Sequence, residues 1–389
     1  MGFYRVFKYE LFRILSQVSP RNIFIIIPLV TFSFLTLIYI KGVIRENPVA
    51  VMDLDHSQLS RTLSQMINQS NGTEVKLHLT SEQKIDRVFL DYPEITAIVV
   101  IPKDFDADIR KGRSKTVTIF TNSANIVIGN ILKKELLTIT NTFAGGVQIK
   151  KLLNKDFTYN EALALVLPIK VNTHSLYNPW YNYLFYLTPG LMTVLLQMIV
   201  FFVAARSING DITRGNYPRI FELSGKNPLI LILGKIAAIT FMGMVVSILI
   251  IGIMYPIFGI TVNGSYLSLF LLFFLLVLSS AALGIMISTI FSEEIMAMDI
   301  AFVYNSPAFV FSGFTFPIMG MPWYDNFYAQ LIPYTHFLKG FFQVYQMDAP
   351  FRYILPSIQA LLVFFFAGLI VSLVLLMIKQ PKLILNTGD

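Results

Sequence analysis

Residues 229–258 read LILILGKIAAITFMGMVVSILIIGIMYPIF and contain one charged side chain, that of Lys235. A helix that crosses the hydrocarbon core of a bilayer, about 30 Å thick, needs roughly 20 mainly apolar residues. Inside lipid such a helix satisfies its own backbone hydrogen bonds. The stretch therefore predicts a membrane-spanning helix.

Other parts of the chain have the same composition. The further apolar stretches are Ile23–Ile40, Leu184–Ala205, Tyr266–Phe291, Ala297–Phe311 and Ile354–Ile378. The stretch at 297–311 is the shortest of them and contains Asn305 and Pro307. Over the whole chain 55% of residues are hydrophobic and 14% are charged, whereas about a quarter are charged in soluble domains. We therefore predict a polytopic α-helical membrane protein with about six transmembrane helices.

The first residues form a separate amphipathic segment. Phe3, Val6, Phe7, Leu11, Ile14 and Leu15 recur at helical spacing, with cationic residues elsewhere around the helix. We predict a helix over 1–21 that lies in the cytoplasmic membrane interface. A simple extension of the first span, 22–41, is the alternative. The charged residues that we assign to the interface are Arg5, Lys8, Glu10, Arg13 and Lys235, the last because a lysine near a span end can extend its side chain outward.

Short basic segments indicate the orientation, because lysine and arginine are enriched in short cytoplasmic loops. The three basic segments are 1–21, the loop 206–227 and the tail 380–389 with the end of the last span. Both termini are therefore expected in the cytoplasm, the segment 42–182 outside, and the remaining spans within 183–379. The acidic loop 292–296, with Glu293 and Glu294, does not follow this pattern.

The segment 42–182 has a pattern of its own. Strand-like runs begin at Val49, Ile95 and Thr116, and a helical pattern follows Ser57, a residue suited to cap a helix. Strands that alternate with helices predict an inserted extracytoplasmic α/β domain. From Ile126 to about Val171 the pattern is helical, with predicted breaks at Gly145–Gly146 and near Asn154, which predicts a helical hairpin.

Several motifs, in order along nearly the whole chain, carry a family resemblance. They are Lys8–Arg13, Val49–Ser60, Ala97–Phe105, Ile109–Gly112, Gly234–Lys235, Ile287–Met298, Phe311–Ile318, Met321–Trp323 and Leu331–Gly340. In this combination the chain resembles the type-2 ABC transporter permeases, the export-type membrane subunits with a large extracytoplasmic domain between the first two spans.

The resemblance implies a coupling segment that docks on an ATPase after the second span. The matching residues here are Asp211, Arg214, Gly215, Asn216, Tyr217, Arg219 and Glu222. Asn216 stands where the family usually has threonine, and Pro218 and Arg219 where acidic or amide residues are common. The coupling contacts are therefore left open, and solvated interfacial charges are the alternative.

The segment 312–340 is predicted to form a hairpin that re-enters the outer leaflet. Its glycines and prolines break helices where a spanning segment would need a satisfied backbone. The residues assigned to this outer gate are Ser312, Gly313, Phe314, Phe316, Pro317, Met321, Pro322 and Trp323. A plain aromatic belt at the membrane surface is the alternative.

Partners and cofactors follow from what the sequence lacks and from the resemblance. No phosphate-cradling Gly-x-x-x-x-Gly-Lys-Ser/Thr run occurs, so the chain is not expected to be an enzyme or to bind a cofactor. ATP and Mg are expected on a separate ABC ATPase, present in two copies. The four histidines are too dispersed to form a metal site, and cysteine is absent. Because the basic residues are also dispersed, we expect membrane lipids rather than nucleic acid as their partner.

The function implied is that of a permease subunit in the bacterial cytoplasmic (inner) membrane. It would export an amphipathic or hydrophobic solute, drug-like or lipid-like, from the cytoplasm or inner leaflet, together with an identical or paralogous second permease. Whether a periplasmic adaptor and an outer-membrane channel take part is not decided by the sequence. The alternative is a non-transporting receptor or scaffold whose outer domain binds a ligand or envelope partner.

Overall fold

The computed structural model describes residues 1–42, 45–169, 171–179 and 181–385, with side chains to 379. The chain divides into a helical unit, Met1–Gly42 with Ser175–Asp389, and an inserted unit, Val43–His174. Residues 175–179, 181 and 182, predicted as part of the outer domain, belong by their contacts to the helical unit.

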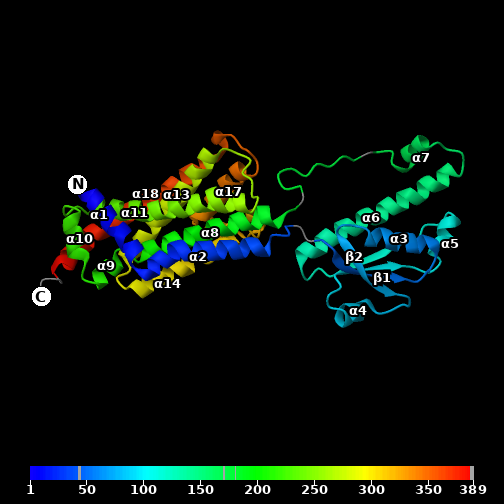
Figure 1. Ribbon diagram of the computed structural model, residues 1–389, viewed down its shortest axis with the longest axis horizontal. Helices are drawn as coiled ribbons and strands as arrows, with labels where there is room; N and C mark the ends of the chain where they lie inside the picture. The colour runs from blue at the N-terminus through cyan, green and yellow to red at the C-terminus, as the bar shows by residue number, and fades with distance from the viewer. Residues whose placement is uncertain (43–44, 170, 180, 386–389) are drawn as a thin grey trace. The chain divides into compact units, whose positions relative to one another are not determined.

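The helical unit contains both long and short helices (Figure 1). Its elements are α1 (Gly2–Ser16), α2 (Val18–Ile38), α8 (Tyr183–Ala205), α9 (Asn209–Thr213), α10 (Tyr217–Leu223), α11 (Pro228–Leu249), the π-helix η1 (Ile250–Met254), α12 (Tyr255–Ile257), α13 (Tyr266–Ile290), α14 (Glu294–Asn305), α15 (Ala308–Phe311), the 3-10 helix η2 (Ile318–Gly320), α16 (Trp323–Gln330), α17 (Pro333–Tyr345) and α18 (Phe351–Leu385).

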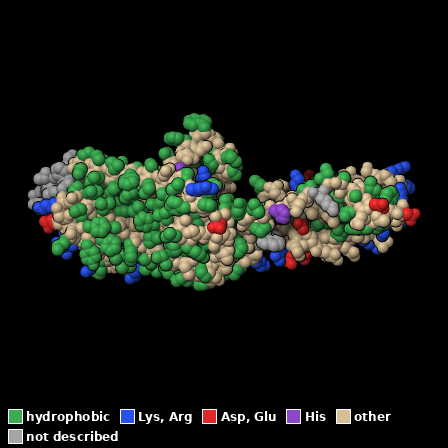
Figure 2. Space-filling model, turned by 90° about the horizontal axis from the view of Figure 1, so that it is seen from above, with side chains coloured by type: hydrophobic (Ala, Val, Ile, Leu, Met, Phe, Trp, Pro, Cys, Tyr) green, Lys and Arg blue, Asp and Glu red, His purple; other side chains and the backbone are tan. Residues whose placement is uncertain are grey.

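Among the described residues, five helices are long and apolar enough to cross a membrane: α2, α8, α11 extended to Ile257, α13 and α18. The sixth apolar stretch forms two short helices, α14 and α15, which part at Ser306–Pro307. Proline lacks the backbone N–H that would continue the ladder. Figure 2 shows apolar side chains over most of the visible face of the helical unit. The prediction of a polytopic helical membrane protein with an α/β insert is confirmed.

The core of the helical unit depends on small residues where α8 and α13 cross. A Cβ added to Gly284 would lie 2.5 Å from the Cβ of Ala204 and 2.6 Å from the carbonyl oxygen of Phe201. Membrane helices pack through such small residues because lipid supplies no hydrophobic drive for their association. These two helices are largely buried, whereas α2 and α18 are mostly exposed along their lengths.

The inserted unit is a four-stranded sheet with helices. Its elements are β1 (Asn47–Asp53), α3 (Gln58–Asn68), β2 (Thr73–Leu79), α4 (Ile85–Asp91), β3 (Ala97–Ile101), α5 (Phe105–Arg110), β4 (Thr118–Thr121), α6 (Ile126–Leu153) and α7 (Tyr159–Val166). The strand order is β2-β1-β3-β4, with β1 parallel to β2 and β3, and β4 antiparallel to β3.

Alternating residues of the central strands fill two cores. Val49 and Val51 pack with α3 and α6, whereas Ala50 and Met52 face the opposite core with α4. Ser57 caps α3, as predicted, by accepting from the backbone N–H of Ser60. The predicted break at Gly145–Gly146 is wrong, because α6 continues through both glycines, at a typical cost of about 1 kcal/mol each. The chain turns only after Leu153.

Candidate functional site

Residues predicted for two separate roles meet at one end of the helical unit. Figure 1 shows α1, α9 and α10 together there, near the last turns of α18. The helix α1 packs against α10 and α11, and α10 packs against α18. The loop 206–227 therefore sits on α1 and on the first turns of α11.

A buried charge cluster, defined here as Glu10, Arg13, Asp211 and Lys235, holds these elements together. The Lys235 ammonium donates to Glu10 Oε2 at 2.8 Å and to Asp211 Oδ2 at 2.5 Å. Arg13 Nη2 donates to Glu10 Oε1 at 2.5 Å. Glu10 is 0% exposed, Lys235 and Asp211 are 1% exposed, and Arg13 is 7% exposed. The cluster thus links α1, α9 and α11 by direct ionic contacts.

Ser207 completes the polar surroundings of the cluster. Its hydroxyl donates to Glu10 Oε1 at 2.9 Å. Lys235 Nζ lies 3.1 Å from both the carbonyl and the hydroxyl oxygen of Ser207. Lys235 therefore directs its ammonium to four oxygen atoms, which offsets part of the cost of removing a charge from water.

The charges of the cluster balance. Burial alone would raise the pKa of Glu10, but the nearby Arg13 and Lys235 outweigh it and lower that pKa to about 2. For Arg13, burial opposes the effect of Glu10 and Asp211, and the pKa is raised. A carboxyl whose pKa is lower in the folded state stabilises the fold at every pH above its pKa in the unfolded state. Glu10 therefore contributes its full stabilisation at neutral pH. That contribution is lost only as pH falls from about 4.5 toward about 2.

Gly234 allows α1 to approach α11 closely enough for this contact. A Cβ at Gly234 would lie 2.8 Å from the Cβ of Val6 and 3.3 Å from the carbonyl oxygen of Phe3. Val6 lies one helical turn before Glu10, and Lys235 follows Gly234 directly. The Gly-Lys pair noted in the sequence thus combines a site of close helix approach with the central cation of the cluster.

Two expectations for the interface are wrong. Lys235 does not extend to a membrane surface, because its side chain is buried among acidic partners. Arg13 does not lie on a solvent-facing side of α1, because it is buried with Glu10. Arg5 and Lys8 are exposed, as are Tyr4 and Phe12. The signal that could have found the cluster is the i, i+3 pair Glu10–Arg13 together with a lysine inside an otherwise uncharged span.

The residues assigned to coupling separate into an inner and an outer set. Asp211 and Tyr217 are buried, whereas Arg214, Gly215, Arg219 and Glu222 are exposed and Asn216 is partly exposed. Tyr217, Ile220 and Phe221 of α10 join the same apolar core as Val6. Burial raises the pKa of Tyr217 to about 12. One face of α10 thus packs into the apolar core, while its charged side chains are exposed on the other face.

An ion-paired carboxylate explains the acidic loop 292–296. Glu294 forms a salt bridge with Arg206 and lies 3.5 Å from Arg214 Nη2. The first turn of α14 is therefore tied to the ends of α8 and α9. The charge of Glu294 is thus balanced by two arginines of the neighbouring basic segment.

The residues assigned to the outer gate lie away from this cluster, beyond α15. Ser312 and Phe314 are buried, and Gly313 has a left-handed φ of 85°. The Tyr186 hydroxyl donates to the Phe314 carbonyl at 2.7 Å, which fixes the turn to α8. The remaining members are exposed or partly exposed: Phe316, Pro317, Met321, Pro322 and Trp323.

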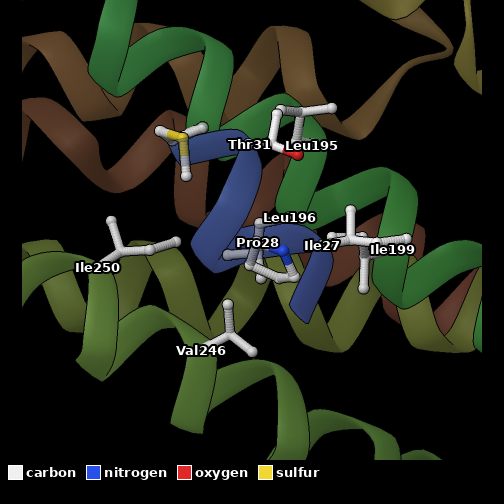
Figure 3. A pocket seen from close by; sticks show the side chains of 9 residues that line it. Ile27, Pro28, Thr31, Leu195, Leu196, Ile199, Val246 and Ile250 are labelled. Atoms are coloured by element: carbon white, nitrogen blue, oxygen red, sulfur yellow. The ribbon is translucent and has the colours of Figure 1, made fainter. Parts of the chain in front are cut away.

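A small apolar cavity between α2, α8 and α11 does not qualify as a site. Figure 3 shows side chains from these helices around Pro28, among them Leu196 and Val246. Its volume is about 10 Å³, at the lower limit for one water molecule, and it is apolar. Across the ranges that the structure describes, no group of three or more His, Asp or Glu residues could hold a metal ion.

Replacing Gly234 with alanine is expected to destabilise the protein by about 1–3 kcal/mol, because the added methyl group would overlap Val6 and force α1 away from α11. Thermal unfolding of the purified chain measures the effect. Gly252→Ala is the matched control, since a Cβ there meets no atom within 4 Å. Equal stability of the two variants would contradict close packing of α1 on α11.

Comparisons with known proteins agree with this architecture. Residues 22–374 match the family model of the ABC-2 family transporter proteins. The chain is 23% identical over 316 residues to the "Probable multidrug ABC transporter permease YbhR" of Escherichia coli strain K12, covering 81% of this chain and 82% of that protein. It is 24% identical over 251 residues to the "Probable multidrug ABC transporter permease YbhS" of the same strain, covering 63% of each chain. The resemblance predicted from the motifs is confirmed: the chain belongs to the ABC-2 family of transporter proteins.

Proposed function

We propose that this chain, a membrane subunit of an ABC transporter, is the permease of an exporter that moves an amphipathic or hydrophobic solute out of the cytoplasm or inner leaflet. The observation that carries the proposal is the exposed charged face of α10 above a buried ionic anchor to α1 and α11. A separate ATPase that docks on this face supplies the energy. The word multidrug in the names of the two Escherichia coli relatives supports a drug-like solute.

The buried charge cluster gives this docking a mechanical consequence. A displacement of α9 and α10 would carry Asp211 with it, and Asp211 is bonded to Lys235 in the first turns of α11. Separating them would leave buried charges unpaired, at a cost of several kcal/mol. The two elements, and α1 through Glu10, therefore move as one body when the ATPase changes conformation.

The assembly proposed is a pair of permeases, identical or paralogous, with two ATPases carrying ATP and Mg. The permease resides in the bacterial inner membrane with both termini in the cytoplasm. Support for this orientation comes from the helical unit itself, where α1, α9 and α10 lie at one end near the last turns of α18 (Figure 1). These elements contain the basic segments that favour the cytoplasmic side.

Co-purification tests the proposal. The tagged full-length chain, co-expressed with a candidate ABC ATPase and extracted in mild detergent, is expected to retain that ATPase in a one-to-one ratio of subunits. ATP-dependent movement of a fluorescent amphiphile in vesicles that contain the complex then tests export. A purified chain that never retains an ATPase would favour the receptor or scaffold function.

Single introduced cysteines test the orientation, and the absence of native cysteine makes the labelling unambiguous. Cysteine at Ser57 or Ser123 is expected to react with a membrane-impermeant maleimide from outside the cell. Cysteine at Asn216 or Thr387 is expected to react only after the membrane is opened; Thr387 lies outside the described residues. Labelling of Asn216→Cys from outside would refute the proposed topology.

A further inference from the structure

A cavity of about 600 Å³ lies between the outer gate and α17 and α18 of the helical unit. Its volume falls within the usual range of small-molecule sites. The turn after α15 and η2 contribute Ser312 and Ile318 to the lining, and α17 contributes Thr335 and Phe342. The cavity is separate from the buried charge cluster and contains none of its residues.

Three buried polar atoms of residues that line the cavity have no hydrogen-bond partner in the described part of the chain. They are Ser312 Oγ, Thr335 Oγ1 and Gln343 Oε1. Ser312 is 2% exposed and Thr335 is 5% exposed. A buried polar group without a partner typically costs about 1–3 kcal/mol. Because nearly all buried polar groups in proteins are paired, these three side chains are available to pair with a polar group that enters the cavity.

The charge of the lining favours an anionic group on that occupant. Lys339 lines the cavity and, within the described chain, forms no ion pair with a carboxylate. His336 lies beside it, with Nε2 3.0 Å from the carbonyl oxygen of Gln330. No aspartate or glutamate is among the lining residues. An anionic headgroup could therefore accept hydrogen bonds from Lys339, Ser312 and Thr335 without meeting a negative charge.

The remaining lining is apolar. Ile318, Met319, Leu338, Phe342 and Met347 contribute to the walls. Methionine side chains adapt to ligands of irregular shape because they are unbranched and flexible. The cavity thus combines a cationic, hydroxyl-lined region with a surface suited to hydrocarbon.

We propose that this cavity binds an amphiphile whose headgroup carries an anionic phosphate-like oxygen cluster, with Lys339 as the charge partner and Ser312 and Thr335 as hydroxyl donors. The membrane setting of the cavity rests on the proposed function. The occupant is either a resident bilayer lipid or a transported solute of the same chemistry. In both cases residues of the outer gate take part in ligand binding.

Native mass spectrometry of the purified chain in a non-ionic maltoside detergent, which carries no phosphate, tests the proposal. Dioctanoyl phosphatidate is expected to bind, while dioctanoylglycerol, which has the same tails without the phosphate, binds at least about tenfold more weakly. Glycerol 3-phosphate, the headgroup without tails, is expected to bind at least about tenfold more weakly as well, since it buries no apolar surface.

Variants assign the binding to the cavity. Lys339→Gln is expected to weaken phosphatidate binding about tenfold, and Lys339→Arg, which keeps the charge, restores most of it. Arg352→Gln is the matched control, because Arg352 is an exposed cation at the start of α18 that does not line the cavity. Thr335→Val, which is nearly isosteric, is expected to weaken binding a further few-fold.

Undiminished binding by Lys339→Gln, an equal loss in Arg352→Gln, or equal binding of phosphatidate and dioctanoylglycerol would overturn the assignment. Glycerol 3-phosphate binding as tightly as phosphatidate would also overturn it. Addition of ATP and Mg to the complex with its ATPase distinguishes the two sources: release of the probe identifies a transported solute, and retention identifies a resident lipid. Failure of this binding assay leaves ATPase co-purification intact, so the two proposals fail separately.

Discussion

Replacing Lys235 with methionine is expected to destabilise the protein by about 3–5 kcal/mol, the typical cost of breaking a buried ion pair from one side. The substitution leaves Glu10 and Asp211, both essentially unexposed, with Arg13 as the one remaining cation of the cluster. One buried negative charge is then uncompensated. Thermal unfolding of the purified chain in detergent, with membrane abundance measured in parallel, quantifies the loss.

The double variant Asp211→Asn with Lys235→Met is the decisive comparison. It removes one charge of each sign, so that Glu10 keeps Arg13 as its partner and the cluster is again neutral. We expect it to recover a large part of the lost stability, which a simple loss of lysine packing would not allow. Lys226→Met is the matched control, because Lys226 is an exposed lysine that follows α10 by three residues. A double variant no more stable than Lys235→Met would contradict the ionic role of the cluster.

Reversing Arg219 to glutamate and Glu222 to arginine together is expected to abolish coupling while the protein stays folded. Both side chains are exposed on α10, whose opposite face is buried. A charge that faces its own sign at a partly buried interface costs on the order of several kcal/mol, which lowers affinity by two or more orders of magnitude. The expected result is normal membrane abundance with loss of ATPase co-purification and of transport-coupled hydrolysis.

A matched reversal elsewhere separates this effect from a general change of charge. Arg87 and Asp91 are exposed on α4 of the inserted unit, and their double reversal preserves net charge in the same way. We expect that variant to retain both the ATPase and its stimulated hydrolysis. Unchanged coupling in the α10 variant would show that the exposed face of this helix is not the docking surface.

The sequence alone determined the class of the protein and most of its helices. Runs such as Leu229–Phe258 predict spans because the lipid requirement depends on length and composition, which are local properties. The cap at Ser57 was likewise predictable, since the hydroxyl and its N–H partner are three residues apart. The strand β2 was not predicted, although Val75, Leu77 and Leu79 alternate with polar residues as in a half-buried strand. Its pairing with β1 became evident only in the fold.

Only the tertiary structure decided which charges belong together. Lys235 and Glu10 are 225 residues apart in sequence, and each taken alone fits an ordinary residue near a membrane surface. Their pairing depends on the close approach of α1 to α11 at Gly234. It also depends on the turn after α8, which brings Asp211 into hydrogen-bond contact with Lys235. Periodicity shows which face of a helix is apolar, but it does not show which neighbouring helix covers that face. A buried ion network is a property of several helices at once. The sequence contained a hint of charged residues in unusual places, but only the folded protein showed which of them pair.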